Sequence, residues 1–481
     1  MFPRHLQGRV NNIFLTMLSY SKEVSGYSNS QVLKKIVDDI IKLEAEPVSL
    51  NINGQAKKVY FLLGGILGDN KGLNELLDYV SSFHANFICR VCRIPSQDLK
   101  HQTVEIPELL RNSQNYALDV ALRDPSKTGV KTESAFNRIP NFNVTDNKIV
   151  DLMHDIFEGF AHNVLRYSIN YFISIGVFTL ETLNERFKKF DYDINDVRDF
   201  SNRNIEEKHL KSKFKMTASQ MMKFLHNLPM MIGDLVESTN MVWIFLISFI
   251  KLVNILLKFS FNDNDLILLQ EQIHETLSDY QHIFGYDLHL KPKAHFLTHY
   301  PSVIKEFGPI RGFWTMRFEA YHHCLKEFAL STSSRRNLCL TIAIKNRLLM
   351  AHHMLENIDV NSSTLFCPGN KKYITYGEIC DWSIGNEHDV LYKYSSILFS
   401  NLKITKGMVM TMKCGTVFSF HQIFHMIYRN SEILFLCKTF KTASYNAHYD
   451  GYEIDQLDGH CILKSKDVNM GRIKCIYYRI T

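Results

Sequence analysis

Apolar residues recur at helical spacing through most of residues 149–290, where glycine and proline are rare. Because residues three and four positions apart lie on one side of a helix, this periodicity predicts long amphipathic helices. The predicted helices cover residues 149–172, 180–190 and 218–257, and two more follow at 317–325 and 338–355. We therefore expect helix to dominate the middle of the chain.

The sequence changes character after Cys367-Pro-Gly-Asn370. From there on, turn residues separate short apolar or alternating runs, a pattern typical of strands. The runs are residues 408–412, 417–420, 433–437 and 475–478. We predict a separate, small β-rich domain over residues 370–481. At roughly 150 residues per domain, the length of 481 residues indicates two or three domains, or one domain with a large insertion.

The beginning of the chain mixes helix and strand signals. Residues 11–20 form a short apolar run that suits a buried strand or a short helix. Ser28 and Ser30 then offer N-caps for a helix over residues 30–44, whose apolar residues recur at helical spacing.

A hairpin signal follows this helix. Apolar runs at residues 48–52 and 59–63 flank Asn53-Gly54, and a type I′ turn between two strands favours this pair because both residues must adopt positive φ. The second run is apolar enough to be a central strand. It leads to Asp69, so we expect this carboxylate at the exposed end of a buried strand.

Composition narrows the class of protein. Hydrophobic residues make up 46% of the chain and aromatic residues 12%, which is enough for a packed core and argues against disorder. The net charge of +6 permits nucleic-acid binding without requiring it. Only Cys89 and Cys92 lie close together among ten cysteines, and no apolar signal region follows Met1. We expect a reduced, intracellular protein.

The most apolar stretch, residues 241–257, is interrupted by Lys251 and Asn254. A membrane span needs about 20 predominantly apolar residues, so this stretch falls short. It predicts a buried core helix in a soluble protein, and we expect no membrane partner.

Two pairs of residues have the spacing of metal ligands. Cys89 and Cys92 can bind one zinc ion, but they supply only half of a site, and a redox pair or two unrelated thiols remain open. His295 and His299 lie four positions apart, which places two imidazoles on one helix face. Together the pairs would complete a tetrahedral Cys2His2 site.

Two carboxylates are candidates for binding Mg²⁺. Asp69 would be held by rigid backbone at a strand end while solvent reaches it. Glu319 falls early in the predicted helix over residues 317–325 and could share a metal ion with Asp69. Taken singly, Asp69 is better explained by a turn and Glu319 by a solvated helix surface.

The order of these residues resembles that in a known family. Asp69, the Cys pair, a long helical region, the His pair and Glu319 follow one another as in the catalytic core of the CACTA-type (tnp2-like) DNA transposases. That layout is similar to the catalytic core of the V(D)J recombinase. Longer stretches also resemble metazoan tnp2-like proteins, namely residues 67–70, 83–92, 151–159, 291–301 and 313–319. The resemblance covers about residues 10–350.

The resemblance implies an α/β fold built on an RNase H-like core. That core would comprise residues 1–100 and 291–355, and a mainly helical insertion over residues 101–290 would interrupt it. In the family, a Cys pair follows the second catalytic Asp, and a His pair completes a zinc site before the final catalytic Glu. The implied zinc ligands are therefore Cys89, Cys92, His295 and His299. The implied catalytic, Mg²⁺-binding residues are Asp69 and Glu319, and Asp151 and His154 match a D-x-x-H motif whose role the sequence does not define.

The family mechanism is two-metal phosphoryl transfer, in which three carboxylates hold two Mg²⁺ ions. The first of these is an Asp on the first core strand, well upstream of the second. Asp38 and Asp39 are the only aspartates before Asp69, and both fall in the helix predicted over residues 30–44. We therefore expect that the first catalytic Asp is absent, that the RNase H-like core is truncated at its N-terminus and that DNA cleavage is lost.

Three functions remain open. The chain could be an active Mg²⁺-dependent transposase or nuclease whose gene model is incomplete at the N-terminus, a non-catalytic zinc protein that binds DNA or protein, or a relic. The resemblance favours a nuclear over a cytoplasmic location, and it leaves DNA as a partner and a homo-oligomer open. The charge runs at residues 208–215 and at Arg335-Arg336 could neutralise phosphates, although such runs are commonly plain solvated surface. The β-rich domain carries aromatic residues suited to a binding face or to packing, namely Tyr373, Tyr376, Tyr445, His448, Tyr449 and Tyr452.

Overall fold

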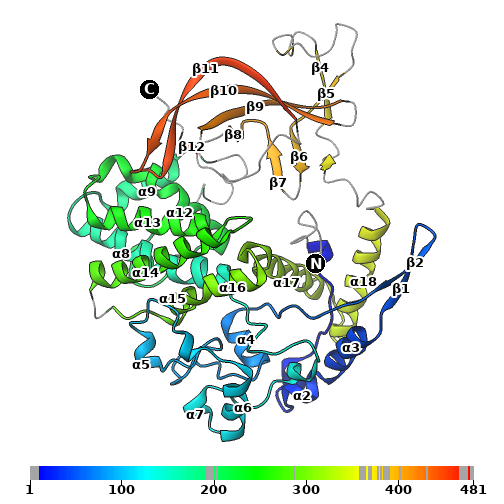
Figure 1. Cartoon of the computed structure of the whole chain (residues 1–481). Helices are drawn as coiled ribbons and strands as arrows, with labels where there is room; N and C mark the ends of the chain where they lie inside the picture. The colour runs from blue at the N-terminus through cyan, green and yellow to red at the C-terminus, as the bar shows by residue number, and fades with distance from the viewer. Residues whose placement is uncertain are drawn as a thin grey trace. The chain divides into compact units, whose positions relative to one another are not determined.

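The structure, a computed structural model, mixes helices and sheets (Figure 1). It describes residues 10–190, 192, 200, 204–285, 288–356, 364–366, 371–375, 379, 382, 391–399, 402–414, 417–429, 432–464 and 475–476. The chain divides into two compact units. The helical unit comprises Ile13–Asn227 and Thr239–Ala351, and the β unit comprises Met1–Asn12, Leu228–Ser238 and His352–Thr481.

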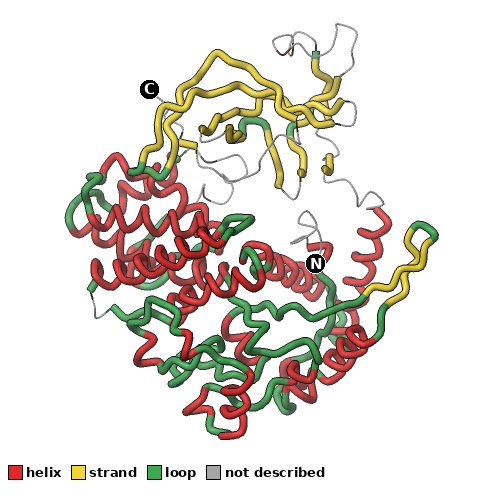
Figure 2. Tube along the Cα trace, in the orientation of Figure 1, coloured by secondary structure: helices red, strands yellow, loops and turns green. Residues whose placement is uncertain are grey.

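The β unit contains two sheets, drawn in yellow in Figure 2. The larger has the strand order β12-β11-β10-β9-β5-β4, with β8 also paired to β9, and the smaller has the order β3-β6-β7. The strands are β3 (Thr364–Phe366), β4 (Lys371–Ile374), β5 (Leu391–Tyr394), β6 (Ser396–Phe399), β7 (Leu402–Thr405), β8 (Val409–Cys414), β9 (Val417–Arg429), β10 (Glu432–Asn446), β11 (Gly451–Lys464) and β12 (Cys475–Ile476). The strands predicted at residues 408–412, 417–420 and 433–437 are confirmed as parts of β8, β9 and β10.

The helical unit begins with short helices and one hairpin. Its elements up to the long helices are α1 (Ser21–Val24), α2 (Asn29–Val32), α3 (Lys34–Ala45), β1 (Val48–Ile52), β2 (Gln55–Val59), α4 (Asn70–Leu76), α5 (Ser96–Leu99), η2 (Pro107–Leu109), α6 (Ser113–Leu122), α7 (Pro125–Thr128) and η3 (Ala135–Arg138). Between α4 and η4 the short helices are joined by irregular segments, and buried side chains such as Ile88, Val91 and Ile94 pack this part of the chain.

Helices of 5–22 residues form the rest of the helical unit. They are the π-helix η4 (Met153–Phe160), α8 (Ala161–Ser174), α9 (Leu180–Lys189), α11 (Glu207–Lys211), α12 (Ala218–Ile232), α13 (Met241–Leu256), α14 (Asp263–Phe284), α15 (Pro292–Phe296), α16 (Tyr300–Phe307), α17 (Met316–Leu330) and α18 (Leu338–Glu356), with 3-10 turns η6 (Leu297–His299) and η7 (Ile310–Gly312) along the chain. The 3-10 turns η1 (Val10–Asn12) and η5 (Gly233–Leu235) belong to the β unit. The predicted helices at residues 149–172, 180–190, 317–325 and 338–355 are confirmed within a few residues. The single segment predicted over 218–257 is two helices, α12 and α13.

Helix α13 is the centre of the helical core. Asn240 caps it by accepting hydrogen bonds from the backbone N–H groups of Val242 and Trp243. Its apolar residues are buried on most sides, and it packs against α8 and α14 (Figure 1). The buried core helix predicted over residues 241–257 is thus confirmed. Within the part of the chain that the structure describes, no helix has the length and apolar character needed to cross a bilayer.

Near the beginning of the chain, one prediction is wrong and one is confirmed with an interruption. Beyond η1, residues 13–20 form neither strand nor helix, and Phe14 and Met17 are exposed. The helix predicted over residues 30–44 is interrupted at Leu33 and forms α2 and α3, with Ser28 bonded to Gln31 at the start of α2. Residues 13–20 have no partner strand, so the N–H and C=O groups of their backbone would stay unpaired in a buried strand. Exposure to water provides these groups with hydrogen-bond partners.

The hairpin is confirmed, but the central strand is not. Strands β1 and β2 pair in register around Asn53 and Gly54, whose φ angles of 52° and 81° suit a type I′ turn. β2 ends at Val59, and residues 60–69 form no strand. The residues of both strands are largely exposed, and no third strand pairs with them among the described residues. Asp69 therefore does not lie at the end of a buried strand.

Candidate metal centre

Cys89 and Cys92 lie in an irregular loop that packing makes rigid. The backbone N–H groups of Val91 and Cys92 point at the Cys89 Sγ atom, at 3.3 and 3.4 Å. The N–H of Arg93 donates to the Leu109 carbonyl, which fixes the end of the loop. No helix begins at Cys92, so the local structure differs from a redox pair at a helix start.

His295 and His299 come from a nearly continuous helical stretch. His295 lies in α15, His299 lies in η6, and α16 follows directly. Their spacing of four residues places both rings on one face, with 3.3 Å between the two Nε2 atoms. Lys291 precedes Pro292, which begins α15 at the position where a missing N–H is least harmful.

The structure brings the two pairs together in the interior of the helical unit. The Cys89 Sγ lies 3.6 Å from the His299 Nε2, and the Cys92 Sγ lies 3.4 Å from the His295 Nε2. All four ligand atoms lie within 4.8 Å of one another, and all four side chains are buried. This buried Cys2His2 group can hold one metal ion. No other group of three or more such side chains is this close within the described ranges.

Glu105 orients one of the imidazoles, and sequence reasoning missed it. The Glu105 carboxylate accepts a hydrogen bond from the His299 Nδ1–H at 2.5 Å and another from the Ser302 hydroxyl at 3.0 Å. A proton on Nδ1 leaves the Nε2 lone pair free to face the cysteines. The signal that could have revealed this role is weak, because Glu105 lies 194 positions from His299 in sequence.

Electrostatics favour a thiolate at this centre. Burial alone would raise the pKa of Cys89, but the hydrogen bond from Cys92 and the charges of His295 and His299 bring it well below its ordinary value. The pKa of Cys92 is raised by its hydrogen bond with Cys89 and by burial. One negative charge is therefore shared by two thiols in a dry site.

Asp151, His154 and Glu319 form a second cluster. The Asp151 carboxylate accepts hydrogen bonds from the His154 Nδ1–H and from the Thr315 hydroxyl, each at 2.5 Å. The His154 Nε2 lies 3.3 Å from a Glu319 oxygen. Burial would raise the pKa of Asp151, but these hydrogen bonds lower it. The D-x-x-H motif thus joins the start of η4 to the first turn of α17, and Glu319 faces it.

Asp69 occupies a different role from the one expected. Its carboxylate accepts a hydrogen bond from the Gly72 N–H at 2.6 Å, so it is the N-cap of α4. The next residue, Asn70, is buried and donates to Asp155 at 2.5 Å while accepting from Arg90 at 2.7 Å. No hydrogen bond or ion pair joins Asp69 to Glu319 in the described residues, and the two do not form part of a three-ligand metal group.

A buried polar network that the sequence did not predict links the two clusters. Arg90, in the cysteine loop, donates to Asn70 and to the Ile149 carbonyl. Asp155, in η4, also accepts from the Tyr300 hydroxyl at 3.1 Å. Burial and the nearby Asp151 charge raise the pKa of Asp155 to about 7. The cysteine loop, η4 and α16 are therefore held to one another by charged hydrogen bonds.

Asp38 and Asp39 both lie in α3, as predicted. Asp38 pairs with Lys34 and Arg138, and Asp39 pairs with Lys35. Both carboxylates therefore lie on the surface of a helix and not on a strand.

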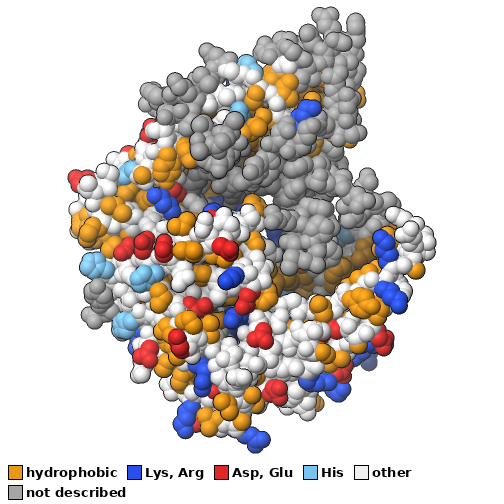
Figure 3. Space-filling view, viewed as in Figure 1, with side chains coloured by type: hydrophobic (Ala, Val, Ile, Leu, Met, Phe, Trp, Pro, Cys, Tyr) orange, Lys and Arg blue, Asp and Glu red, His pale blue; other side chains and the backbone are white. Residues whose placement is uncertain are grey.

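The candidate DNA-binding charges are spread over the surface. Lys208 and Lys211, in α11, pair with Glu206 and Glu207. Arg335 and Arg336 are exposed between α17 and α18. On the face shown in Figure 3, blue basic side chains of the helical unit are interspersed with red acidic ones. These features describe a solvated surface of mixed charge.

The aromatic residues of the β unit pack in pairs. Tyr373 contacts Tyr392 with ring centroids 4.8 Å apart, and Tyr445 contacts Tyr452 at 5.3 Å. His448 packs edge-on against Tyr449. Tyr376 lies outside the described residues. This pairing agrees with strand-surface packing.

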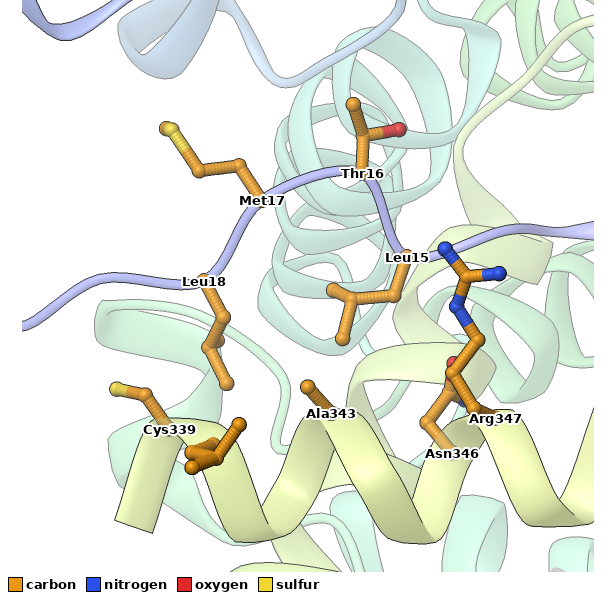
Figure 4. Close-up of a pocket in the computed structure, with 9 residues that line it drawn as sticks. Leu15, Thr16, Met17, Leu18, Cys339, Ala343, Asn346 and Arg347 are labelled. Atoms are coloured by element: carbon orange, nitrogen blue, oxygen red, sulfur yellow. The ribbon is translucent and has the colours of Figure 1, made fainter. Parts of the chain in front are cut away.

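A separate pocket in the helical unit has a mixed polar and apolar lining (Figure 4). It lies between residues 15–18 and α18, and Leu15 and Leu18 point from the extended chain toward the helix. Asn346 already accepts a hydrogen bond from Tyr321. The pocket is lined by Leu15, Thr16, Met17, Leu18, Cys339, Leu340, Ala343, Asn346 and Arg347, a set without a carboxylate or an imidazole.

Comparisons with known proteins add no relative. No model of a known protein family matches this sequence, and no curated protein matches it.

Proposed function

We propose that this chain is a transposase-derived protein of the CACTA type that binds a structural zinc ion and does not cleave DNA by itself. The observation that carries the proposal is the buried Cys2His2 group. Its two halves are separated by about 200 residues and share the order of the family's zinc ligands. The described strands of the helical unit are β1 and β2, which form one hairpin and no larger sheet. The proposal of an RNase H-like core therefore rests on the order of the ligands along the chain.

The ligand distances support zinc. With Zn–S bonds of about 2.3 Å and Zn–N bonds of about 2.0 Å, tetrahedral angles separate sulfur and nitrogen by about 3.5 Å and two nitrogens by about 3.3 Å. The sulfur–nitrogen distances here are 3.6 and 3.4 Å, and the nitrogen–nitrogen distance is 3.3 Å. Hard cations such as Mg²⁺ prefer oxygen ligands, so the donor set argues against them.

A structural role fits this site better than a catalytic one. Four protein ligands fill a tetrahedral shell, whereas a catalytic zinc keeps one position for water. The ligands are buried, and Glu105 holds His299 from outside the shell. Zinc would cross-link the cysteine loop to α15 and η6.

The carboxylates support loss of cleavage. Two-metal catalysis needs three of them around one phosphate. Asp69 caps α4, Glu319 faces His154, and Asp38 lies in ion pairs on α3. We propose that the retained activity is binding of DNA or protein, in the nucleus and in a homo-oligomer.

Zinc analysis of the purified chain tests the metal. We expect one zinc ion per chain, and we expect the double variant Cys92→Ser/His299→Ala to lose it. The matched control Cys339→Ser/His323→Ala changes the same residue types away from the site and should retain zinc. Zinc retention by the first double variant would show that these residues are not the ligands.

A plasmid assay tests the alternative of an active nuclease. We expect no Mg²⁺-dependent nicking by the wild-type chain and binding to duplex DNA that weakens as salt rises. Nicking that disappears in Asp69→Asn would instead establish the enzyme. Absence of salt-dependent binding would contradict DNA as the partner.

A further inference from the structure

A second sulfur site lies in the β unit, on the antiparallel pair β10 and β11. Cys437 of β10 stands directly opposite Cys461 of β11 in the strand register, so both side chains lie on the same face. Cys437 is completely buried, and Cys461 is half-buried at the edge of the same apolar cluster. Each thiol influences the ionisation of the other, and the Cys437 thiol donates to the Phe435 carbonyl at 3.6 Å.

An imidazole completes this arrangement. His421, on β9, stands opposite Thr439 of β10 in the register. Its Nδ1 lies 3.1 Å from the Cys461 Sγ and 3.2 Å from the Thr439 Oγ1. The Ser419 hydroxyl lies 2.8 Å from the Nε2, so an accepting Nε2 leaves the Nδ1–H directed at the sulfur.

The hydrogen bonds around Cys461 favour its thiolate. Bonds from Cys437, His421 and Thr439 lower the pKa of Cys461 to about 4, although burial opposes this shift. The pKa of Cys437 is raised by its hydrogen bond to Cys461 and by burial. The two thiols are therefore unequal: the half-buried Cys461 favours its thiolate, and the buried Cys437 favours its thiol.

Metal binding does not explain this cluster. Within the described part of the chain, its sulfur and nitrogen atoms do not form a three-ligand group of metal-binding dimensions. The arrangement of a thiol beside an imidazole suits nucleophilic attack.

We propose that Cys461 is a reactive thiolate that undergoes thiol–disulfide exchange, and that Cys437 is its resolving partner in a reversible disulfide between β10 and β11. In the first step the Cys461 sulfur attacks a small disulfide such as oxidised glutathione, forming a mixed disulfide and releasing one glutathione thiolate. In the second step the Cys437 sulfur attacks the Cys461 sulfur, and the second glutathione leaves with the Cys437 proton. Two protein thiols are oxidised and one glutathione disulfide is reduced to two thiols.

The strand geometry requires little movement for this bond. Directly opposed residues of antiparallel strands have Cβ atoms about 4.5–5.5 Å apart, and a disulfide needs about 3.5–4.5 Å. The product would cross-link two central strands of the larger sheet. This chemistry is independent of the proposed zinc centre, whose cysteines lie in the other unit.

Peptide mapping of the full-length, zinc-loaded chain tests the proposal. Reduced protein is treated with oxidised glutathione, alkylated, digested without reductant and analysed by mass spectrometry. We expect a cross-linked Cys437–Cys461 peptide that dithiothreitol removes. Cys437→Ser should stop at a mixed disulfide on Cys461, and Cys461→Ser should leave Cys437 unmodified. Circular dichroism confirms that each variant is folded.

The pH profile of alkylation separates a reactive thiolate from mere exposure. Between pH 5 and pH 8 the rate at Cys461 should change less than about threefold, whereas a peptide thiol rises roughly several hundredfold. His421→Phe should restore a steep profile, and His421→Asn, which keeps an N–H near the Nδ1 position, should restore it less. A steep profile in the wild-type chain, or glutathione on Cys461 with no cross-link to Cys437, would overturn the proposal.

Discussion

At the scale of single residues, the partners of each buried polar group decide what that group can do. His299 is a suitable ligand because Glu105 fixes its proton on Nδ1. His154 is likewise oriented by Asp151 and presents its other nitrogen to Glu319. In both cases a carboxylate on one ring nitrogen determines the use of the other.

We expect Glu105→Gln to weaken zinc binding by about 10–100-fold, because a neutral amide orients and polarises His299 less than a carboxylate does. Competition with a chromophoric chelator measures the change in Kd. Glu108→Gln alters an exposed carboxylate in η2, three residues further along, and should leave the Kd unchanged. Equal Kd values for both variants would show that Glu105 has no influence on the metal.

His162 illustrates the opposite situation, a buried imidazole without partners. Neither ring nitrogen has a hydrogen-bond partner, and the ring stacks on Phe214. Burial lowers the pKa of His162 to about 3, and the charges of Lys213, Lys293 and Arg166 add to this. The folded chain therefore holds this side chain neutral.

This residue should make the helical unit sensitive to acid. Because the unfolded chain binds the proton below about pH 6.5 and the folded chain does not, stability falls as the pH drops from about 6.5 toward 3. At pH 5 the loss is about 2 kcal/mol. Urea unfolding at pH 7.5 and pH 5 should show a smaller difference for His162→Leu than for the wild type. An unchanged difference would contradict this, and the exposed His323→Gln should behave as the wild type.

At the scale of elements, local sequence patterns correctly predicted the helices and turns that form their backbone hydrogen bonds within one short segment. Helices α13 and α18 and the β1–β2 turn lie close to their predicted positions. The strand predicted at residues 59–63 did not form beyond Val59, because a strand needs a neighbour to pair with. Asp69 consequently begins a helix instead of ending a strand.

Asp69 should therefore contribute to stability through its cap. We expect Asp69→Ala to lower the free energy of unfolding by about 1 kcal/mol and Asp69→Asn to have little effect, since Asn also accepts the Gly72 N–H. Chemical denaturation compares the three proteins. If both variants are as stable as the wild type, the cap does not contribute to stability.

At the scale of the whole molecule, the metal centre joins segments that are distant in sequence. Cys89 and His299 are 210 positions apart, and the intervening chain contains most of the helical core. A metal ion here would restrict the unfolded chain and order the irregular loop around Cys92. The β unit holds none of these ligands.

Removal of zinc should therefore act on one unit. After chelation, we expect amide hydrogen exchange to speed up in residues 88–94 and 292–307, while β10 and β11 keep their protection. Mass spectrometry of the digested protein measures both regions in one experiment. Faster exchange throughout the chain, or no change near Cys92, would contradict a local structural role.

The sequence alone determined what depends on near neighbours. Helical periodicity, the Asn53-Gly54 turn and the spacing within each ligand pair follow from the backbone, so α3, the hairpin and the shared face of His295 and His299 could be predicted. Family order also suggested that the two ligand pairs meet. Only the tertiary structure placed Glu105 on His299, made Asp69 a cap and left residues 60–69 without a strand. These outcomes depend on which distant segments pack together, and burial and backbone pairing between such segments leave no local signal in the chain.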